Sequence, residues 1–219
     1  VMKFEEWGLE NAHLESWDFG RGWTLEGLTL EMRSPRYFPL FGYPEAWTPS
    51  TDGMLEGPPV YIGDWTTDDL RTRGSELHGK AVLIAQPQEG FIEEDRLQPA
   101  DYEEQVRIGA PRFLPTQTPA DRGTLAQLLH DIGVGAVLRP NQGQHGTIFV
   151  LGRDNPDTAS PTVILASEHY NMIVRMIEAG EPVSLRIAIE GQFHEDDTRG
   201  YNVLAEIPGA DPEIGDEVV

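Results

Sequence analysis

The chain has 219 residues, and its hydrophobic content of 39% is enough for the core of one large domain or of a domain with an appendage. Its formal net charge of −21 disfavours binding to nucleic acid and to anionic membranes, and suits a cationic partner, divalent ions or a high-salt environment. No apolar run approaches the roughly 18–20 residues of a membrane span, and the absence of cysteine excludes disulfides and thiolate chemistry.

The first 33 residues predict the end of a helix and two strands. Residues 2–7 carry apolar side chains at the spacing of a helix, and Gly8 is placed to cap it. The following residues, up to 33, alternate between apolar and polar side chains as strands do, and a glycine-rich turn at residues 18–22 separates the two strands.

Arg21 and Trp23 make this glycine-rich turn a candidate binding site. Gly20 and Gly22 permit positive φ angles. Arg21 lies in the sequence between Phe19 and Trp23, so its guanidinium can bind a carboxylate or stack on an aromatic ring. The alternative is a hairpin turn in which Trp23 packs.

Residues 34–59 predict a loop that is rich in proline, glycine and aromatic residues. Prolines at this density exclude a helix and interrupt a sheet. This number of aromatic side chains is unusual in a solvated linker. We therefore expect the loop either to pack within this domain, or to lie against a neighbouring domain and frame a substrate cleft. The candidate cleft or interface residues are Tyr37, Phe38, Phe41, Tyr43 and Trp47.

Residues 60–190 have the pattern of a mixed α/β domain of short strands with a few helices. The apolar run at 80–85 predicts a buried strand, whereas the alternation at 183–189 predicts a half-buried one. Strands are expected at residues 60–63, 80–85, 136–138, 148–151, 162–166 and 183–189.

Three helices are expected to begin at residues whose side chains accept hydrogen bonds from free backbone N–H groups. Their caps and ends are Thr66 or Thr67 to residue 73, Asp121 to Gly133, and Ser167 to residues 179–180. A further helix is expected near residues 100–108, inside the polar stretch 86–119.

Residues 191–219 predict an acidic turn followed by a strand. Glu195, Asp196 and Asp197 could engage a hard cation such as calcium if backbone oxygens helped, although an exposed acidic turn explains them as well. Residues 202–207 predict a strand that either pairs with the N-terminal segment or is mobile. A turn and the first residues of another strand follow, up to Val219.

The residues by themselves assign no catalytic side chain and no firm metal ligand. The six histidines show neither His-Glu-x-x-His nor His-x-His spacing. No serine lies in a Gly-x-Ser-x-Gly motif. The sequence Gly133-Val134-Gly135 lacks the third glycine and the acidic residue of a dinucleotide site.

Four segments, in order, resemble the protease-associated domain. They are Gly79-Lys80 before a strand, the turn Ile132-Gly133-Val134-Gly135-Ala136, the strand start Pro161-Thr162-Val163, and the helix–glycine–strand unit of residues 168–189. The flanks "WGLENAHLESWDFGRGW", "YFPLFGYPEAWTPST" and "GYNVLAEIPGADPEIGDEVV" resemble the segments around this domain in M28-family zinc peptidases. The resemblance covers nearly the whole chain.

The resemblance implies an α+β fold, a small β-sandwich or open barrel of short strands flanked by a few helices. The protease-associated core would be residues 60–190, and residues 1–33, 34–59 and 191–219 would be an N-terminal flank, a connecting loop and a return segment to a peptidase domain. The zinc motif of that family would follow Val219. This segment would then be non-catalytic and without a cofactor, and the parent peptidase domain would hold zinc.

The resemblance also implies partners and a location. The partners would be the peptidase domain of the same chain and a peptide or protein substrate, whose access or specificity the segment would modulate. The parent would hydrolyse peptides in an aminopeptidase-like way, outside the cell or in the periplasm, with a signal peptide upstream. Two alternatives stay open: a free-standing peptide- or calcium-binding module, and an enzyme with an unrecognised site.

Overall fold

The computed structural model describes residues 1–88, 119–143, 145–150, 152 and 155–209. The chain forms two compact units, and each is described by itself. Unit 1 contains Val1–Gly22 and Phe193–Val219, and unit 2 contains Trp23–Gln192. The chain therefore passes between the units twice. The functional division expected at residues 33, 59 and 190 stays a prediction.

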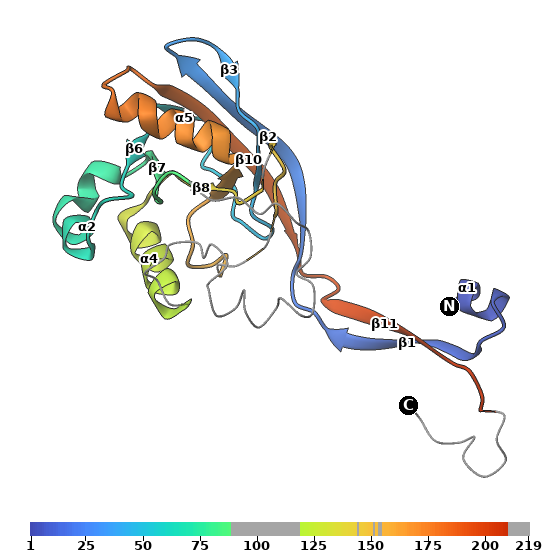
Figure 1. The fold of residues 1–219 in the computed structure, drawn as a ribbon. Coiled ribbons are helices and arrows are strands. Elements are labelled where there is room, and N and C mark those ends of the chain that lie inside the picture. The colour runs from blue at the N-terminus through green and yellow to red at the C-terminus, as the bar shows by residue number, and fades with distance from the viewer. Residues whose placement is uncertain (89–118, 144, 151, 153–154, 210–219) are drawn as a thin grey trace, which may run out of the picture. The chain divides into compact units, whose positions relative to one another are not determined.

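Unit 1 contains the short helix α1 (Met2–Glu6) and an antiparallel ribbon of β1 (Glu10–Asp18) and β11 (Arg199–Glu206) (Figure 1). Gly8 follows the end of α1 with a φ of 81°, which confirms the predicted cap. The expected pairing of the N-terminal segment with residues 202–207 is also confirmed, since Leu14 lies opposite Val203. The hairpin alternative for residues 18–22 is wrong, because β1 pairs with β11 and not with the next strand.

Unit 2 is built on two sheets. The four-stranded sheet has the order β3-β2-β10-β5 and the five-stranded sheet the order β4-β9-β8-β7-β6. In the five-stranded sheet, β6 to β9 are parallel and β4 is antiparallel to β9. The strands are β2 (Gly22–Ser34), β3 (Phe38–Pro39), β4 (Gly42–Pro44), β5 (Leu55–Gly57), β6 (Val60–Tyr61), β7 (Ala81–Leu83), β8 (Ala136–Pro140), β9 (Thr162–Leu165) and β10 (Ser184–His194).

Successive side chains of the parallel strands point to opposite faces of the sheet and contribute to two cores. Leu83, Leu138 and Leu165 point into a core shared with α5 (Ser167–Glu178) and the four-stranded sheet. Val82 and Val137 point into a core on the other face. That face is covered by α2 (Thr67–Arg73), the 3₁₀ helix η1 (Gly74–Leu77) and α4 (Pro119–Ile132), and Figure 1 shows α5 on one side of these strands with α2 and α4 on the other. Each fully buried side chain of this size contributes about 1.5–3 kcal/mol.

The helix caps agree with the sequence at one position and differ at two. Thr66 caps α2: the N–H of Asp69 donates to its hydroxyl at 3.1 Å, and its own N–H donates to the Asp69 carboxylate at 2.8 Å. Asp121 is not a cap, because the backbone is already helical from Pro119. Ser167 is the first residue of α5, and its hydroxyl donates to the carbonyl of Asn141 instead of accepting from the helix.

The strand expected at 148–151 is wrong for the described residues 148–150, which have no strand partner. The reason is the buried side chain of Asn141. Its oxygen accepts the Phe149 N–H at 3.0 Å and its nitrogen donates to the Thr147 carbonyl, so these backbone groups are satisfied by a side chain. Some predictions lie outside the described residues: the helix near 100–108, residue 151, the predicted turn from residue 210 on, and the last predicted strand.

The expected fold class, a mixed α/β chain made mostly of sheet with a few helices, is confirmed. Within the described ranges, no helix combines the length and the apolar character needed to cross a membrane.

Candidate functional site

Unit 2 has a pocket of about 480 Å³ beyond the carboxyl ends of β8 and β9. Ligands bind at this edge of parallel sheets because the loops after the strands converge there. The volume lies within the roughly 300–1,000 Å³ of small-molecule sites. The pocket is lined by Pro39, Leu40, Phe41, His145, Gly146, Ala166, Glu168 and His169.

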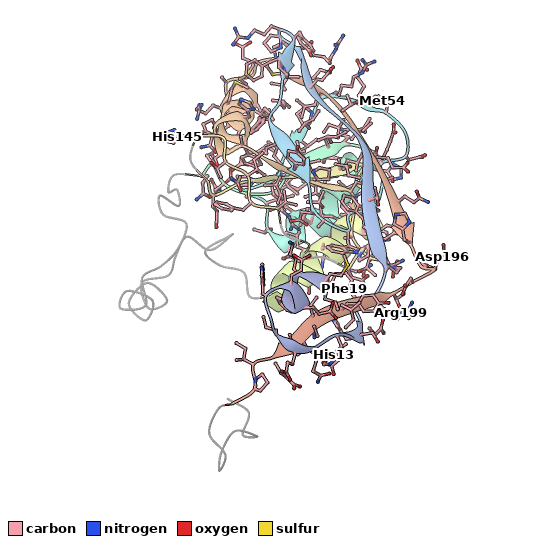
Figure 2. All side chains as sticks on the ribbon, turned by 90° about the vertical axis from the view of Figure 1, so that its right-hand side faces the viewer. His13, Phe19, Met54, His145, Asp196 and Arg199 are labelled. Carbon is pink, nitrogen blue, oxygen red and sulfur yellow. The ribbon has the colours of Figure 1, made fainter. Side chains whose placement is uncertain are left out.

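Asn141 positions the loop that brings His145 and Gly146 to this pocket. It is fully buried, and its side chain holds the backbone of residues 147 and 149. Between Asn141 and Thr147 in the chain, His145 and Gly146 have φ angles of 55° and 74°. The positive φ favours a glycine at position 146, whereas a Cβ there would lie 3.4 Å from the ring of Phe41, an ordinary contact distance. Figure 2 shows His145 at the periphery of the molecule.

His169 connects the pocket to the aromatic loop. Its Nδ1 accepts the backbone N–H of Phe41 at 2.8 Å, and its ring packs edge-to-face with Phe38 with 5.1 Å between ring centres. An Nδ1 that accepts belongs to a neutral imidazole with its proton on Nε2. Burial lowers the pKa of His169, and the neighbouring Glu168 carboxylate opposes this shift only in part, which agrees with the neutral form.

Sequence reasoning missed His169. Its partner Phe41 is 128 residues away in the chain, and no local spacing signals that contact. The only available signal was a histidine in the first turn of an amphipathic helix, which is common in proteins that bind nothing there.

The five aromatic residues predicted as cleft or interface residues lie in different surroundings. Phe38 packs half-buried against the core, and Phe41 lines the pocket with 53% of its side chain exposed. Tyr37 and Tyr43 are exposed and do not line it; the guanidinium of Arg33 lies 5.6 Å from the Tyr37 ring centre.

Trp47 lines a second, much smaller cavity. Its φ is 61°, and the cavity of about 10 Å³ has room for one water molecule. The neighbouring Glu45 is buried and accepts a hydrogen bond from Arg139 at 2.9 Å. This partly buried ion pair holds the loop against β8, and no local pattern in the sequence predicts it.

Arg21 and Trp23 have different partners, within different units. The Arg21 guanidinium lies 4.8 Å from the ring centre of Phe193 and 3.7 Å from a Glu195 oxygen, in unit 1. The indole N–H of Trp23 donates to the Thr48 carbonyl at 3.0 Å, in unit 2. The structure therefore does not bring these two candidates together with the pocket into one described site.

Two of the three acidic candidates already contact an arginine. Glu195 pairs with Arg21, and the Asp197 carboxylate accepts from the Arg199 guanidinium at 2.8 and 2.9 Å. The hydrogen bonds from Arg199 lower the pKa of Asp197 to about 2. Asp196 lies at the turn between β10 and β11 (Figure 2). A cation here would compete with both arginines. No group of three or more potential ligands converges on one point among the residues with described side chains.

The chain is similar to several peptidases in sequence or in fold. No family model matches the chain. It is 24% identical over 208 residues to carboxypeptidase Q of Mus musculus, covering 93% of this chain and 38% of that protein. It superimposes on a peptidase M28 precursor from Shewanella amazonensis SB2B with a TM-score of 0.65 and 18% identity, covering 96% of this chain and 44% of the other.

Two further solved structures have the same fold. They are an aminopeptidase from Aneurinibacillus sp. strain AM-1, with a TM-score of 0.55 and 17% identity, and a zinc aminopeptidase from Bacillus subtilis, with 0.52 and 11%. The alignments cover 96% of this chain and 42% and 40% of those chains. The chain thus spans less than half the length of the proteins that it matches, and its structural neighbours are M28 peptidases and zinc aminopeptidases.

Proposed function

We propose that this chain is the non-catalytic protease-associated segment of an M28-type zinc exopeptidase, in which it modulates substrate access or specificity. The parent protein hydrolyses peptides in an aminopeptidase-like way. The support is a fold that follows M28 and aminopeptidase structures over nearly all of this chain, together with the sequence similarity to carboxypeptidase Q.

The pairing of β1 with β11 is the observation that carries this proposal. The two strands come from opposite ends of the described chain, and the ladder runs from Glu10 opposite Glu206 to Asp18 opposite Arg199. Unit 2 lies between them in sequence and has two cores of its own. A domain inserted into another protein needs its entry and exit side by side, and the ribbon supplies that arrangement.

The described residues do not fit a zinc site of their own. His145, Glu168 and His169 line one pocket but do not converge as a set of three ligands, and the Nδ1 of His169 already accepts a hydrogen bond. In the proposal, zinc is held by the peptidase domain of the same protein, outside the cell or in the periplasm. The pocket and the aromatic loop face either that domain or the peptide substrate.

The proposal is tested in the full-length protein by replacing Trp23–Gln192 with a short Gly-Ser linker between Gly22 and Phe193. We expect the variant to keep its zinc and to hydrolyse small aminoacyl anilides. We expect its kcat/KM on longer peptides to change at least tenfold relative to the anilides, because contacts remote from the scissile bond act through orientation and binding. An unchanged ratio in a folded, zinc-loaded variant would contradict the role in access and specificity.

The non-catalytic character is tested on the present chain alone, incubated with zinc and a panel of aminopeptidase and carboxypeptidase substrates. We expect neither turnover nor stoichiometric zinc. Turnover that a chelator abolishes would place a metal site within this chain and refute the proposal.

A further inference from the structure

Four arginines among the described residues share one arrangement. Each guanidinium lies over an aromatic ring and also pairs with a carboxylate. The partners are Phe193 and Glu195 for Arg21, Tyr37 and Glu31 for Arg33, Trp65 and Glu76 for Arg73, and Tyr201 and Asp197 for Arg199. The distances from guanidinium carbon to ring centre range from 4.1 Å at Arg73 to 5.7 Å at Arg199. In this arrangement the face of the ring and the carboxylate both attract the cation, and the carboxylate also accepts hydrogen bonds from Arg33, Arg73 and Arg199.

The pocket beyond β8 and β9 presents the ring and the carboxylate of this arrangement without the arginine. Phe41 and Glu168 line it together, and both are exposed. Glu168 forms no ion pair with any residue in the part of the chain that the structure describes. The neighbouring lining is apolar, from Pro39, Leu40 and Ala166, and suits the aliphatic stem of a long side chain.

The remaining polar groups of the pocket also suit a cation. His169 is held neutral by the hydrogen bond that its Nδ1 accepts from Phe41, so it does not repel a positive charge. His145 is the third titratable residue of the described lining, beside Glu168 and His169. The formal net charge of −21 raises the local concentration of cationic peptides around the whole protein.

We infer that this pocket binds the side chain of an arginine in a peptide, with the guanidinium between the Phe41 ring and the Glu168 carboxylate. The inference rests on the proposed function, because an accessory segment of a peptidase meets peptide substrates. It gives that segment a preference: peptides with an arginine are retained near the peptidase domain, and neutral analogues are not.

The test is a titration of the ¹⁵N-labelled chain with acetyl-Gly-Arg-Gly-amide, followed by amide NMR shifts. We expect saturable shifts at residues 41, 146, 168 and 169. The same peptide with citrulline, which is nearly isosteric and uncharged, should bind at least fivefold more weakly. Glu168→Gln and Phe41→Leu should each weaken binding of the arginine peptide about two- to fivefold, as expected for one exposed ion pair or one cation–π contact.

Two matched variants separate the pocket from the general acidity of the chain. Glu181→Gln removes an exposed carboxylate beyond the far end of α5, and Tyr43→Leu removes an exposed aromatic ring that does not line the pocket. Both variants should bind the arginine peptide within twofold of the original affinity. Amide spectra that agree with those of the original chain away from the pocket show that each variant is folded.

Equal binding of the arginine and citrulline peptides would overturn the inference, and so would shifts that map outside the pocket or an unchanged affinity of Glu168→Gln. Concentration-dependent self-association that Glu168→Gln abolishes would also contradict it, since an arginine of a second copy would then be the occupant. None of these results affects the outcome of the domain-replacement experiment, so the two proposals fail separately.

Discussion

Side chains point alternately to the two faces of the strands in both units, but they are buried in unit 2 and exposed in unit 1. In β7 and β8 of unit 2, the alternation buries Leu83 and Leu138 in one core and Val137 in the other. In the ribbon of unit 1, Leu14 and Val203 lie opposite each other and are 53% and 46% exposed. The sequence predicts a strand in both places, but the side chains of a strand form a core only where a second layer covers them.

The largest expected effect contrasts a leucine from each unit. Leu138→Ala removes a fully buried side chain and should lower the free energy of unfolding by about 2–5 kcal/mol. Leu14→Ala should change it by no more than about 0.5 kcal/mol, because half of that side chain is already in water. Urea denaturation followed by tryptophan fluorescence measures both. Similar losses for the two variants would show that the ribbon contributes a core of its own.

A smaller loss is expected from one buried hydroxyl of unit 2. The Tyr170 hydroxyl donates to the Ala85 carbonyl at 2.7 Å and accepts the Ala85 N–H at 2.8 Å. Tyr170→Phe leaves both backbone groups buried without that partner and should cost about 1–3 kcal/mol. Tyr43→Phe, at an exposed tyrosine, is the matched control and should be neutral. The measurement is the free energy of unfolding of the two variants by heat or urea. An unchanged value for Tyr170→Phe would mean that the backbone groups of Ala85 find other partners.

Tyr61 should make the stability of unit 2 depend on alkaline pH. Burial, followed by the charges of Asp64 and Glu178, raises the pKa of Tyr61 to about 12. The folded state therefore favours the neutral phenol, whose contribution is complete below pH 10 and is lost as pH rises from 10 through 12. Tyr61→Phe should remove this part of the pH dependence.

The same variant should not destabilise the protein at neutral pH, since the buried Tyr61 oxygen has no hydrogen-bond partner among the residues that the structure describes. The measurement is the free energy of unfolding of both proteins between pH 8 and 11.5. Parallel curves, or a clear loss for Tyr61→Phe at pH 7, would contradict this account.

The smallest effect is expected in unit 1, where the ion pairs are exposed. Asp197→Asn removes the carboxylate that Arg199 contacts, and the midpoint of unfolding should not change measurably, because water screens such pairs. The pair should instead be visible in a carboxyl NMR titration, in which Asp197 protonates near pH 2. Since this pKa is depressed, any contribution to stability is present above about pH 4 and is lost as pH falls towards 2. A midpoint that drops in Asp197→Asn at pH 7 would show that the ribbon depends on this pair.

The parts of the fold that local chemistry dictates could be predicted from the sequence. The capping box of Thr66 and Asp69 lies within four residues, and the apolar run from Ala81 to Leu83 marks a buried strand without reference to the rest of the chain. The strand expected at 148–151 failed because Asn141, a residue outside the pattern, satisfies the backbone there. Ser167 failed as a cap because its hydroxyl has a tertiary partner.

The candidate pocket could not be assembled from the sequence. Its lining comes from residues 39–41, 145–146, 166 and 168–169, which no periodicity or spacing connects. Phe41 is a candidate from the sequence because aromatic side chains are unusual in a proline-rich loop, and this criterion requires no knowledge of tertiary contacts. Glu168 and His169 gave no comparable signal, because a charged residue and a histidine in the first turn of a helix are ordinary.

The large sequence separation between β1 and β11 has a consequence for the order in which the protein folds. The Asn11 amide donates to the Glu206 carboxylate at 2.7 Å across a separation of 195 residues. During synthesis, β1 leaves the ribosome before unit 2 and β11 leaves it after unit 2, so β1 stays without this partner while unit 2 is made. Closing so long a loop carries a large entropic cost, which is reduced once the intervening chain has folded. We therefore expect the ribbon to form after unit 2, and until then the exposed apolar side chains of β1 are a surface through which nascent chains can associate.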